Sequence, residues 1–234
     1  MWRKLSVPHL NEITVCSRSS NLAKVQVKEV WQELLTYHPL VKFHVHYFQS
    51  RGDLDLLTSL RNLGKSDFFT KELDELVLKG SYRIAIHSAK DLPDPLPKGL
   101  DVACFTKGID SSDSLVLKEG SFFEDLPRHA LIATSSVKRE QAVLALRSDL
   151  TFCDLRGTIE QRLAKLGEGK VDGVVIAEAA LIRLGLTHLN RIRLPHSTTE
   201  GQGKLCVIAR QEDWEIKELF QPMHYPFICH THAS

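Results

Sequence analysis

A basic and an acidic residue stand side by side at the end of an apolar run. Residues 84–97 read IAIHSAKDLPDPLP, so Lys90 and Asp91 follow the apolar residues at the point where a strand would leave a sheet. A carboxylate in this position could move protons or stabilise positive charge, and the ammonium beside it could bind an anion. Asp91 could equally be a loop carboxylate that pairs with Lys90 or caps a turn. The groups gathered around the pair therefore decide its interpretation.

Basic residues also follow other apolar runs. Arg18-Ser19-Ser20 follows residues 12–16, and Thr134-Ser135-Ser136-Val137-Lys138-Arg139 follows residues 130–133. A third turn is Leu155-Arg156-Gly157-Thr158, with Arg162 on the helix that follows and Arg183 near the end of a later helix. A serine hydroxyl can cap a helix whose free N–H groups attract an anion, and a neighbouring cation strengthens that attraction.

Each of these turns also has a simpler interpretation. A single turn of this type is more often only a capped helix, whereas three together favour anion binding. Lys138 and Arg139 could be solvated residues of a first helical turn, but cations there are unfavourable unless an anion binds. The pattern therefore indicates a site for a negatively charged ligand.

Alternating strands and helices must position these turns. Apolar or β-branched runs predict strands at residues 12–16, 41–47, 83–87, 100–106, 130–133, 151–155 and 172–177. Helical periodicity predicts helices at residues 22–35, 69–79, 138–147, 159–166 and 178–184. This order is typical of an α/β fold.

Two polar stretches, residues 107–113 and 197–203, are the best candidates for crossings between two domains. They predict a discontinuous domain 1 (residues 1–108 plus 203–234) and an inserted domain 2 (residues 109–202). Ligands of open α/β sheets bind beyond the carboxyl ends of the strands. We therefore expect residues 18, 90, 91, 138, 139 and 156 to face one positive cleft between the domains, with Asp91 as its one carboxylate.

Composition excludes several other functions. The 234 residues carry 30 basic and 29 acidic side chains, and the net charge of +1 provides no general attraction to nucleic acid or a membrane. The amino-terminal residues lack the apolar core of a signal peptide, and no stretch approaches the roughly 18 apolar residues of a membrane span. We therefore expect a cytoplasmic protein.

The cysteines and histidines do not predict a metal site. Cys16, Cys104, Cys153, Cys206 and Cys229 are scattered without paired spacing, which is typical of reduced thiols. The tail that contains His224, Cys229, His230 and His232 fits no standard zinc pattern. Arg51-Gly52-Asp53 is expected to be a turn, and Phe68-Phe69 more often belongs to the core at a helix start than to a stacking site.

Taken together, the motifs resemble porphobilinogen deaminase, also called hydroxymethylbilane synthase. The resemblance covers roughly residues 13 to 204. It lies in Arg18-Ser19-Ser20-Asn21-Leu22-Ala23, Phe69-Thr70-Lys71-Glu72-Leu73, His87-Ser88-Ala89-Lys90-Asp91-Leu92-Pro93, the Thr134–Arg139 motif, Leu155-Arg156-Gly157 with Arg162, and Arg183-Leu184-Gly185-Leu186. It implies two domains like those of type 2 periplasmic binding proteins, with the active site between them.

The resemblance also implies a chemistry. Members of the family join four porphobilinogen units head to tail, and each unit loses ammonia to give an electrophile that the growing chain attacks. Asp91 matches the catalytic aspartate and Lys90 stands beside it as a second catalytic residue. The positions matching residues that bind substrate or the dipyrromethane cofactor are Arg18, Ser20, Phe69, Ser88, Ser135, Ser136, Lys138, Arg139, Arg156, Arg162 and Arg183. Residues 53–67 match a mobile loop.

The chain departs from the family in three places. Lys138-Arg139 replaces an arginine pair, which removes one bidentate donor. Residues 64–69 replace a glycine-rich segment with a basic residue. The family carries its dipyrromethane primer on a cysteine of a third, C-terminal domain, which we expect to be absent. Cys229 lacks the surrounding glycines, so it is only a candidate for the attachment.

Two functions follow from these observations. The first is a monomeric transferase that makes hydroxymethylbilane for tetrapyrrole and haem synthesis. The alternative is a catalytically impaired relative that binds small polycarboxylates in the cleft. A carboxylate inside a positive cleft only weakens anion affinity, so Asp91 favours the enzyme.

Overall fold

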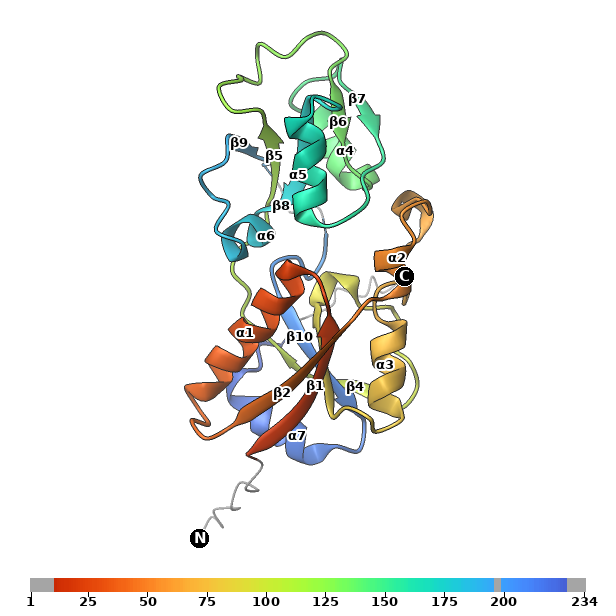
Figure 1. The fold of residues 1–234 in the computed structure, drawn as a ribbon, viewed down its shortest axis with the longest axis vertical. Coiled ribbons are helices and arrows are strands. Elements are labelled where there is room, and N and C mark those ends of the chain that lie inside the picture. Colours follow the sequence, from red (N-terminus) through yellow and green to blue (C-terminus); the bar gives the residue numbers. More distant parts are fainter. Residues whose placement is uncertain (1–10, 196–198, 227–234) are drawn as a thin grey trace, which may run out of the picture.

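The computed structural model describes residues 11–195 and 199–226. These residues form two lobes stacked along the long axis of the molecule, each around its own five-stranded sheet (Figure 1). Helix α2 (Arg51–Leu54) stands beside the level at which the lobes meet. The groups at that level therefore come from both sheets.

The first sheet has the strand order β2-β1-β3-β10-β4. Its strands are β1 (Glu12–Arg18), β2 (Lys42–Phe48), β3 (Ile84–Ser88), β4 (Leu100–Phe105) and β10 (Leu205–Arg210). Strand β1 is parallel to β2 and β3, whereas β10 runs antiparallel between β3 and β4. The carboxyl ends of β1 and β3 therefore lie at the same edge of the sheet.

The second sheet repeats this arrangement in the order β7-β6-β8-β5-β9. Its strands are β5 (Asp113–Leu117), β6 (Leu131–Ala133), β7 (Thr151–Cys153), β8 (Gly173–Ala177) and β9 (Arg191–Arg193). Strand β6 is parallel to β7 and β8, and β5 runs antiparallel between β8 and β9. The antiparallel fourth strand of each sheet follows a segment that crosses between the lobes.

Helices cover both faces of each sheet. Val27, Val30 and Leu34 of α1 (Asn21–Leu35) pack on one face of the first sheet with Ile216 and Leu219 of α7 (Trp214–Phe220). The opposite face is covered by α3 (Lys71–Leu78). In the second lobe, α5 (Ile159–Gly167) and α6 (Glu178–Arg183) cover one face and α4 (Val137–Leu144) covers the other. Each lobe therefore has three layers, with helices on both faces of a sheet.

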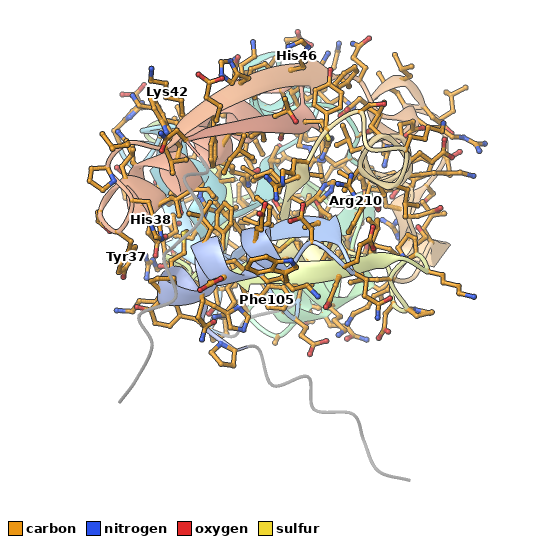
Figure 2. The ribbon with its side chains drawn as sticks, turned by 90° about the horizontal axis from the view of Figure 1, so that it is seen from below. Tyr37, His38, Lys42, His46, Phe105 and Arg210 are labelled. Atoms are coloured by element: carbon orange, nitrogen blue, oxygen red, sulfur yellow. The ribbon has the colours of Figure 1, made fainter. Side chains whose placement is uncertain are left out.

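The end of the first lobe farthest from the second is seen from below in Figure 2. Helix α7 lies in the foreground, and Lys42 and His46 of β2 lie across the view from Phe105 of β4. This separation agrees with β2 and β4 being the two edges of the sheet. The longest helix of the described residues, α1, has 15 residues, and no helix there is long and apolar enough to span a bilayer.

All seven predicted strands and all five predicted helices are present, with ends shifted by a few residues. The sequence patterns do not predict β5, β9, β10, α2 or α7. Strand β5 begins at the last residue of one predicted crossing and β10 begins two residues after the other, where the sequence patterns assign no element. The first sheet contains strands from before the first polar stretch and after the second, and the second sheet contains the strands between them. The residue boundaries of the two domains stay a prediction.

Candidate functional site

A cavity of about 650 Å³ lies between the two lobes. It is lined from the first lobe by residues that follow β1 and β3, and from the second by residues that follow β6 and β7. Of the candidate site residues, those that line it are Arg18, Ser20, Phe69, Ser88, Lys90, Asp91, Ser135, Ser136, Arg139, Arg156 and Arg162. The structure thus brings together eleven of the thirteen side chains that the sequence singles out.

The first-lobe wall of the cavity begins at the end of β1. Ser20 caps α1 by accepting a hydrogen bond from the Ala23 N–H, as the sequence predicts. Arg18 donates from Nε and Nη2 to the Asp53 carboxylate, and its Nη1 lies 3.9 Å from Oδ2 of Asp91. Burial lowers the pKa of Arg18, but the hydrogen bond to Asp53 and the charge of Asp91 outweigh it, so the pKa is raised. Arg18 therefore stays charged beside two carboxylates.

Lys90 and Asp91 occupy a single 3-10 turn, η2 (Ala89–Asp91), directly after β3. The turn aims both side chains into the cavity, where Lys90 Nζ lies 3.3 Å from Oε1 of Gln202. Burial lowers the pKa of Lys90 to about 8, and the charge of Arg139 acts in the same direction. Ser88, at the end of β3, accepts a hydrogen bond of 2.9 Å from Gln26 of α1. The turn is thus held from two sides.

Two helix starts form the second-lobe wall. Ser136 caps α4 and Thr158 caps α5, so both helices present their first turns to the cavity. Ser135 ties the two turns together, because its hydroxyl donates to the Leu155 carbonyl at 2.6 Å and accepts from the Leu155 N–H at 2.8 Å. These serines hold the wall in shape and leave the guanidinium groups to face the ligand space.

The guanidinium groups of this wall are only partly satisfied. Arg139 Nη2 donates to Oδ1 of Asp113 at 2.6 Å, but its buried Nε has no hydrogen-bond partner. Arg156 uses Nη2 for the carbonyls of Gly52 and Asp55, while its buried Nε and Nη1 have none. Burial lowers the pKa of Arg162 to about 10, and the neighbouring guanidinium groups add to the effect. Buried cationic donors without partners are costly, and an anion at this wall could supply the missing acceptors.

Phe69 connects the two walls. The guanidinium carbon of Arg18 lies 4.6 Å from the centre of its ring, and that of Arg156 lies 5.6 Å from it. Gly52 lies so close to the ring that a Cβ there would come within 2.4 Å of it. The ring is therefore held in place between one cation from each lobe and the backbone of α2.

The segment from Asp53 to Asp67, predicted as a mobile loop, contains part of α2 and the turn η1 (Leu60–Asn62) and lies over the second lobe. Arg61 contacts Glu140 of α4 at 2.5 Å and Asp154 at 2.8 Å. Arg156 of the second lobe in turn binds two carbonyls of residues 52–55. The segment thus connects the lobes on one side of the cavity.

Two predicted site residues do not line the cavity. Lys138 is exposed, because neighbouring residues of a helix point about 100° apart and Arg139 takes the direction of the cavity. Arg183 forms a two-pronged pair with Glu29 of α1, at 2.6 and 2.8 Å, and also donates to the Gly203 carbonyl. Arg183 therefore joins the lobes outside the cavity.

The expectation of a single carboxylate in the cleft is also wrong. Asp53 and Glu160 line the cavity with Asp91. Asp53 is the third residue of the short helix α2, which the sequence pattern represents only as a turn. Arg18 together with Ser50 holds the pKa of Asp53 below its usual range against the effect of burial. Glu160 accepts a hydrogen bond from Asn21 across the lobe boundary at 2.9 Å.

The residue patterns do not reveal that Gln202 and Asp113 belong to the site. Both lie in or beside the two crossings, and both contact the basic residues of the cavity. Their partners lie 26 to 112 residues away in the chain, so only the fold joins them. The position of Gln202 between two glycines of a predicted crossing is the one signal that could have drawn attention to it.

The cysteines take no part in this site. Within residues 11–195 and 199–226, Cys16, Cys104, Cys153 and Cys206 are free thiols and none of them lines the cavity. Burial raises the pKa of both Cys16 and Cys104 to about 12. Within the same residues no group of three or more His, Cys, Asp or Glu side chains could hold a metal. Cys229 and most of the histidine-rich tail lie outside the described residues.

Sequence relatives identify the family. Residues 13–218 match the family model described as porphobilinogen deaminase, dipyromethane cofactor binding domain. Porphobilinogen deaminase of Roseiflexus castenholzii is 37% identical over 219 residues, which are 92% of this chain and 72% of that protein. The probable porphobilinogen deaminase of Chlamydia pneumoniae is 36% identical over 219 residues, 94% of this chain and 91% of that protein.

Solved structures agree on the fold. A periplasmic substrate-binding protein of an ABC transporter from Coxiella burnetii superposes with a TM-score of 0.56 at 16% identity, over 92% of both chains. A putative methionine-binding lipoprotein from Bacillus subtilis gives a TM-score of 0.52 at 14% identity, over 92% of this chain and 91% of that one. The two α/β domains are thus built like those of periplasmic binding proteins, as expected. The match over residues 13–218 and the relatives at 36–37% identity show that the chain belongs to the porphobilinogen deaminase family.

Proposed function

We propose that the chain is a transferase that joins four porphobilinogen molecules into hydroxymethylbilane and releases ammonia. The observation that carries this proposal is the cavity itself, in which cations from both lobes surround Asp91. Each pyrrole unit carries acetate and propionate groups, so the substrate and the growing chain are polyanions. A cavity that holds several cations beside the Asp91 carboxylate suits a polyanion that passes through a cationic reaction step.

The second-lobe wall supports the binding part of the proposal. Guanidinium groups bind carboxylates through paired hydrogen bonds. The unpartnered nitrogens of Arg156 and Arg139 are buried donors for such bonds, and Arg162 lies beside them. Arg18 and Lys90 are the cations of the opposite wall. We assign Ser20, Ser88, Ser135 and Ser136 to the support of these groups, since each makes a hydrogen bond within the wall.

The same residues fit the dipyrromethane cofactor of the family. Its four carboxylate groups match the unpartnered nitrogens of Arg139 and Arg156, and Phe69 offers an aromatic ring beside them. When bound, dipyrromethane supplies the primer to which the first substrate unit is joined. Within the part of the chain that the structure describes, no cysteine lines the cavity, so the attachment cysteine is not identified.

Asp91 is the candidate for charge stabilisation and proton transfer. As ammonia leaves the substrate, positive charge develops on the pyrrole, whose N–H donates to a carboxylate. Asp91 is half-buried in the cavity, with Arg18 3.9 Å away. Lys90, on the same turn, places an ammonium beside the substrate carboxylates. In this proposal Lys90 binds the substrate carboxylates and Asp91 assists the reaction.

A cytoplasmic, monomeric enzyme of haem biosynthesis, without nucleic-acid or membrane partners, belongs to the same proposal. Its support is the balance of 30 basic and 29 acidic residues, which gives the chain no general attraction to nucleic acid or to a membrane. Gel filtration with light scattering at several protein concentrations tests the monomer directly.

The decisive experiment follows the intact mass of the chain and the formation of uroporphyrin after porphobilinogen is added. A resting mass two pyrrole units above the sequence mass, growing with substrate while pigment forms, is expected. Asp91→Asn should abolish the pigment, whereas Asp94→Asn, the same change at an exposed loop position, should not. An unmodified mass without pigment would leave a polycarboxylate-binding protein instead.

A further inference from the structure

The two crossings between the lobes meet at one buried side chain. Gln202 is 4% exposed, and its amide contacts five polar groups from three parts of the chain. Oε1 accepts from Lys90 Nζ at 3.3 Å and from Arg139 Nη2 at 3.2 Å. Nε2 donates to the carbonyls of Ser111 and Ser112 and to Oδ1 of Asp113, at 2.8 to 3.1 Å.

The backbone around Gln202 is shaped for these contacts. Gly201 and Gly203 both have positive φ angles, 72° and 83°. A Cβ on Gly201 would come within 3.2 Å of the backbone of Ala89 and Lys90, and one on Gly203 within 2.1 Å of the Asp110 carbonyl. The two glycines therefore let the return crossing lie against the Lys90 turn on one side and against the first crossing on the other.

We propose that Gln202 is a positioning residue, whose amide holds Lys90 of the first lobe and Arg139 of the second at a fixed separation and anchors both to the first crossing. An amide suits this place because its oxygen accepts from two cations while its two N–H groups are shared among three acceptors. A carboxylate would repel Asp113, and an ammonium would repel both cations. The expected effect on turnover rests on the proposed function, whereas the expected effect on the Lys90 side chain does not.

The charge of Lys90 gives the proposal a measurable signature. The charged groups near Lys90 are Asp91 on its own turn, Arg139 on α4, Arg162 on α5 and Asp113 on β5, while Lys65 of the adjoining segment is paired with Glu200 at 2.7 Å. The neutral oxygen of Gln202 stabilises the ammonium without adding charge. Removing that oxygen should make Lys90 lose its proton more easily, and replacing it by a carboxylate should make Lys90 hold its proton more tightly.

The test is the pH dependence of Lys90 acetylation by a small reagent, followed by peptide mass spectrometry on the full chain without substrate. Wild-type Lys90 should become reactive near pH 8. Gln202→Leu should move this midpoint downward and Gln202→Glu upward. Lys204→Met is the matched control, because Lys204 also bridges the crossings, through the carbonyls of Thr106 and Lys107, but does not touch Lys90. A midpoint that is unchanged in both Gln202 variants, or that moves equally in the control, would overturn the proposal.

Turnover provides the second measurement. Gln202→Leu should lower kcat about tenfold at pH 8, the loss expected for one hydrogen bond to a charged group, with a smaller change in KM because Arg156 and Arg162 are untouched. The deficit should shrink at pH 6.5, where Lys90 regains its proton. An equal deficit at both pH values would show a merely structural role and contradict the inference. If the wild-type chain makes no hydroxymethylbilane, the proposed function fails while the Lys90 titration still decides the role of Gln202.

Discussion

The two walls of the cavity carry similar numbers of cations but differ in how these are satisfied. On the first-lobe wall, Arg18 is bound by Asp53 and lies near Asp91, so its charge is compensated within the protein. On the second-lobe wall, Arg139 pairs with Asp113 through Nη2, but its buried Nε has no partner, and neither do the buried Nε and Nη1 of Arg156. A compensated cation can orient a carboxylate without holding a ligand, whereas an uncompensated one gains most from an incoming anion. We propose from this difference that the first wall carries the reaction and that the second wall binds the anion.

The strongest test of this division is Asp91→Asn. Loss of the carboxylate that moves protons should lower turnover about a hundredfold to ten-thousandfold. Affinity for uroporphyrin, a polycarboxylate probe, should stay the same or improve, because one negative charge leaves a positive cavity. Calorimetric titration and initial rates measure both in one preparation. Parallel losses of affinity and turnover would place Asp91 on the binding side.

On the opposite wall, Arg156→Met should act mainly on binding. One buried guanidinium that forms charge-assisted bonds to a carboxylate is worth about 1.5 to 3 kcal/mol, so KM for porphobilinogen should rise roughly tenfold to a hundredfold. Arg128→Met, which removes the same charge from an exposed position, controls for net charge. Should kcat fall while KM stays constant, the assignment of this wall to binding would be wrong.

Lys90 lies on the first-lobe wall, but we expect its positive charge to contribute to ligand binding. A change of pH removes this charge and so isolates its contribution. Since the pKa of Lys90 is lowered to about 8, the side chain loses its positive charge as the pH rises through that value. Uroporphyrin affinity should therefore fall by about tenfold between pH 7 and 9.5, the value of one charge-assisted contact. The step should vanish in Lys90→Met and persist in Lys98→Met, a change at an exposed lysine of the same loop.

The smallest expected effect comes from removing the carboxylate that pairs with Arg18. Asp53→Asn removes its compensating charge, so uroporphyrin should bind a few fold more tightly. The pKa of Asp53 is lowered in the folded protein, so its carboxylate stabilises the fold above its ordinary pKa near 4 and this contribution is lost as the pH falls further. The variant should therefore unfold more easily than wild type at pH 7, by about 1 kcal/mol, because Asp53 also completes the cap with Ser50.

This last difference should shrink progressively as the pH falls below about 4, which thermal unfolding followed by circular dichroism can measure. The matched change Asp94→Asn, in an exposed loop, should leave both affinity and the pH dependence of stability as in wild type. Unaltered affinity in Asp53→Asn would mean that Arg18 is already available to ligands in spite of its partner.

The site residues whose positions could be predicted from the sequence are those placed by local structure. Caps at Ser20 and Ser136 follow from short-range rules, and strand ends place Arg18 and Asp91 at one edge of a sheet. Contacts between distant segments were not predictable. Arg183 pairs with Glu29, which is 154 residues earlier in the chain, and therefore does not line the cavity. Gln202 accepts a hydrogen bond from Lys90, which is 112 residues earlier. The distinction between Lys138 and Arg139 needs the first residue of a helix to be known to within one position, which periodicity does not provide.

The place of β10 in the first sheet has a consequence for biosynthesis. The strand lies between β3 and β4, yet β4 ends at Phe105 and β10 begins only at Leu205, after every strand of the second sheet. The ribosome synthesises the chain from its amino end. The first sheet therefore lacks β10 until the whole of the second lobe has been synthesised. The inserted lobe is therefore the first that can finish folding, and the exposed edges of β3 and β4 are the surfaces that a nascent-chain chaperone would have to protect until then.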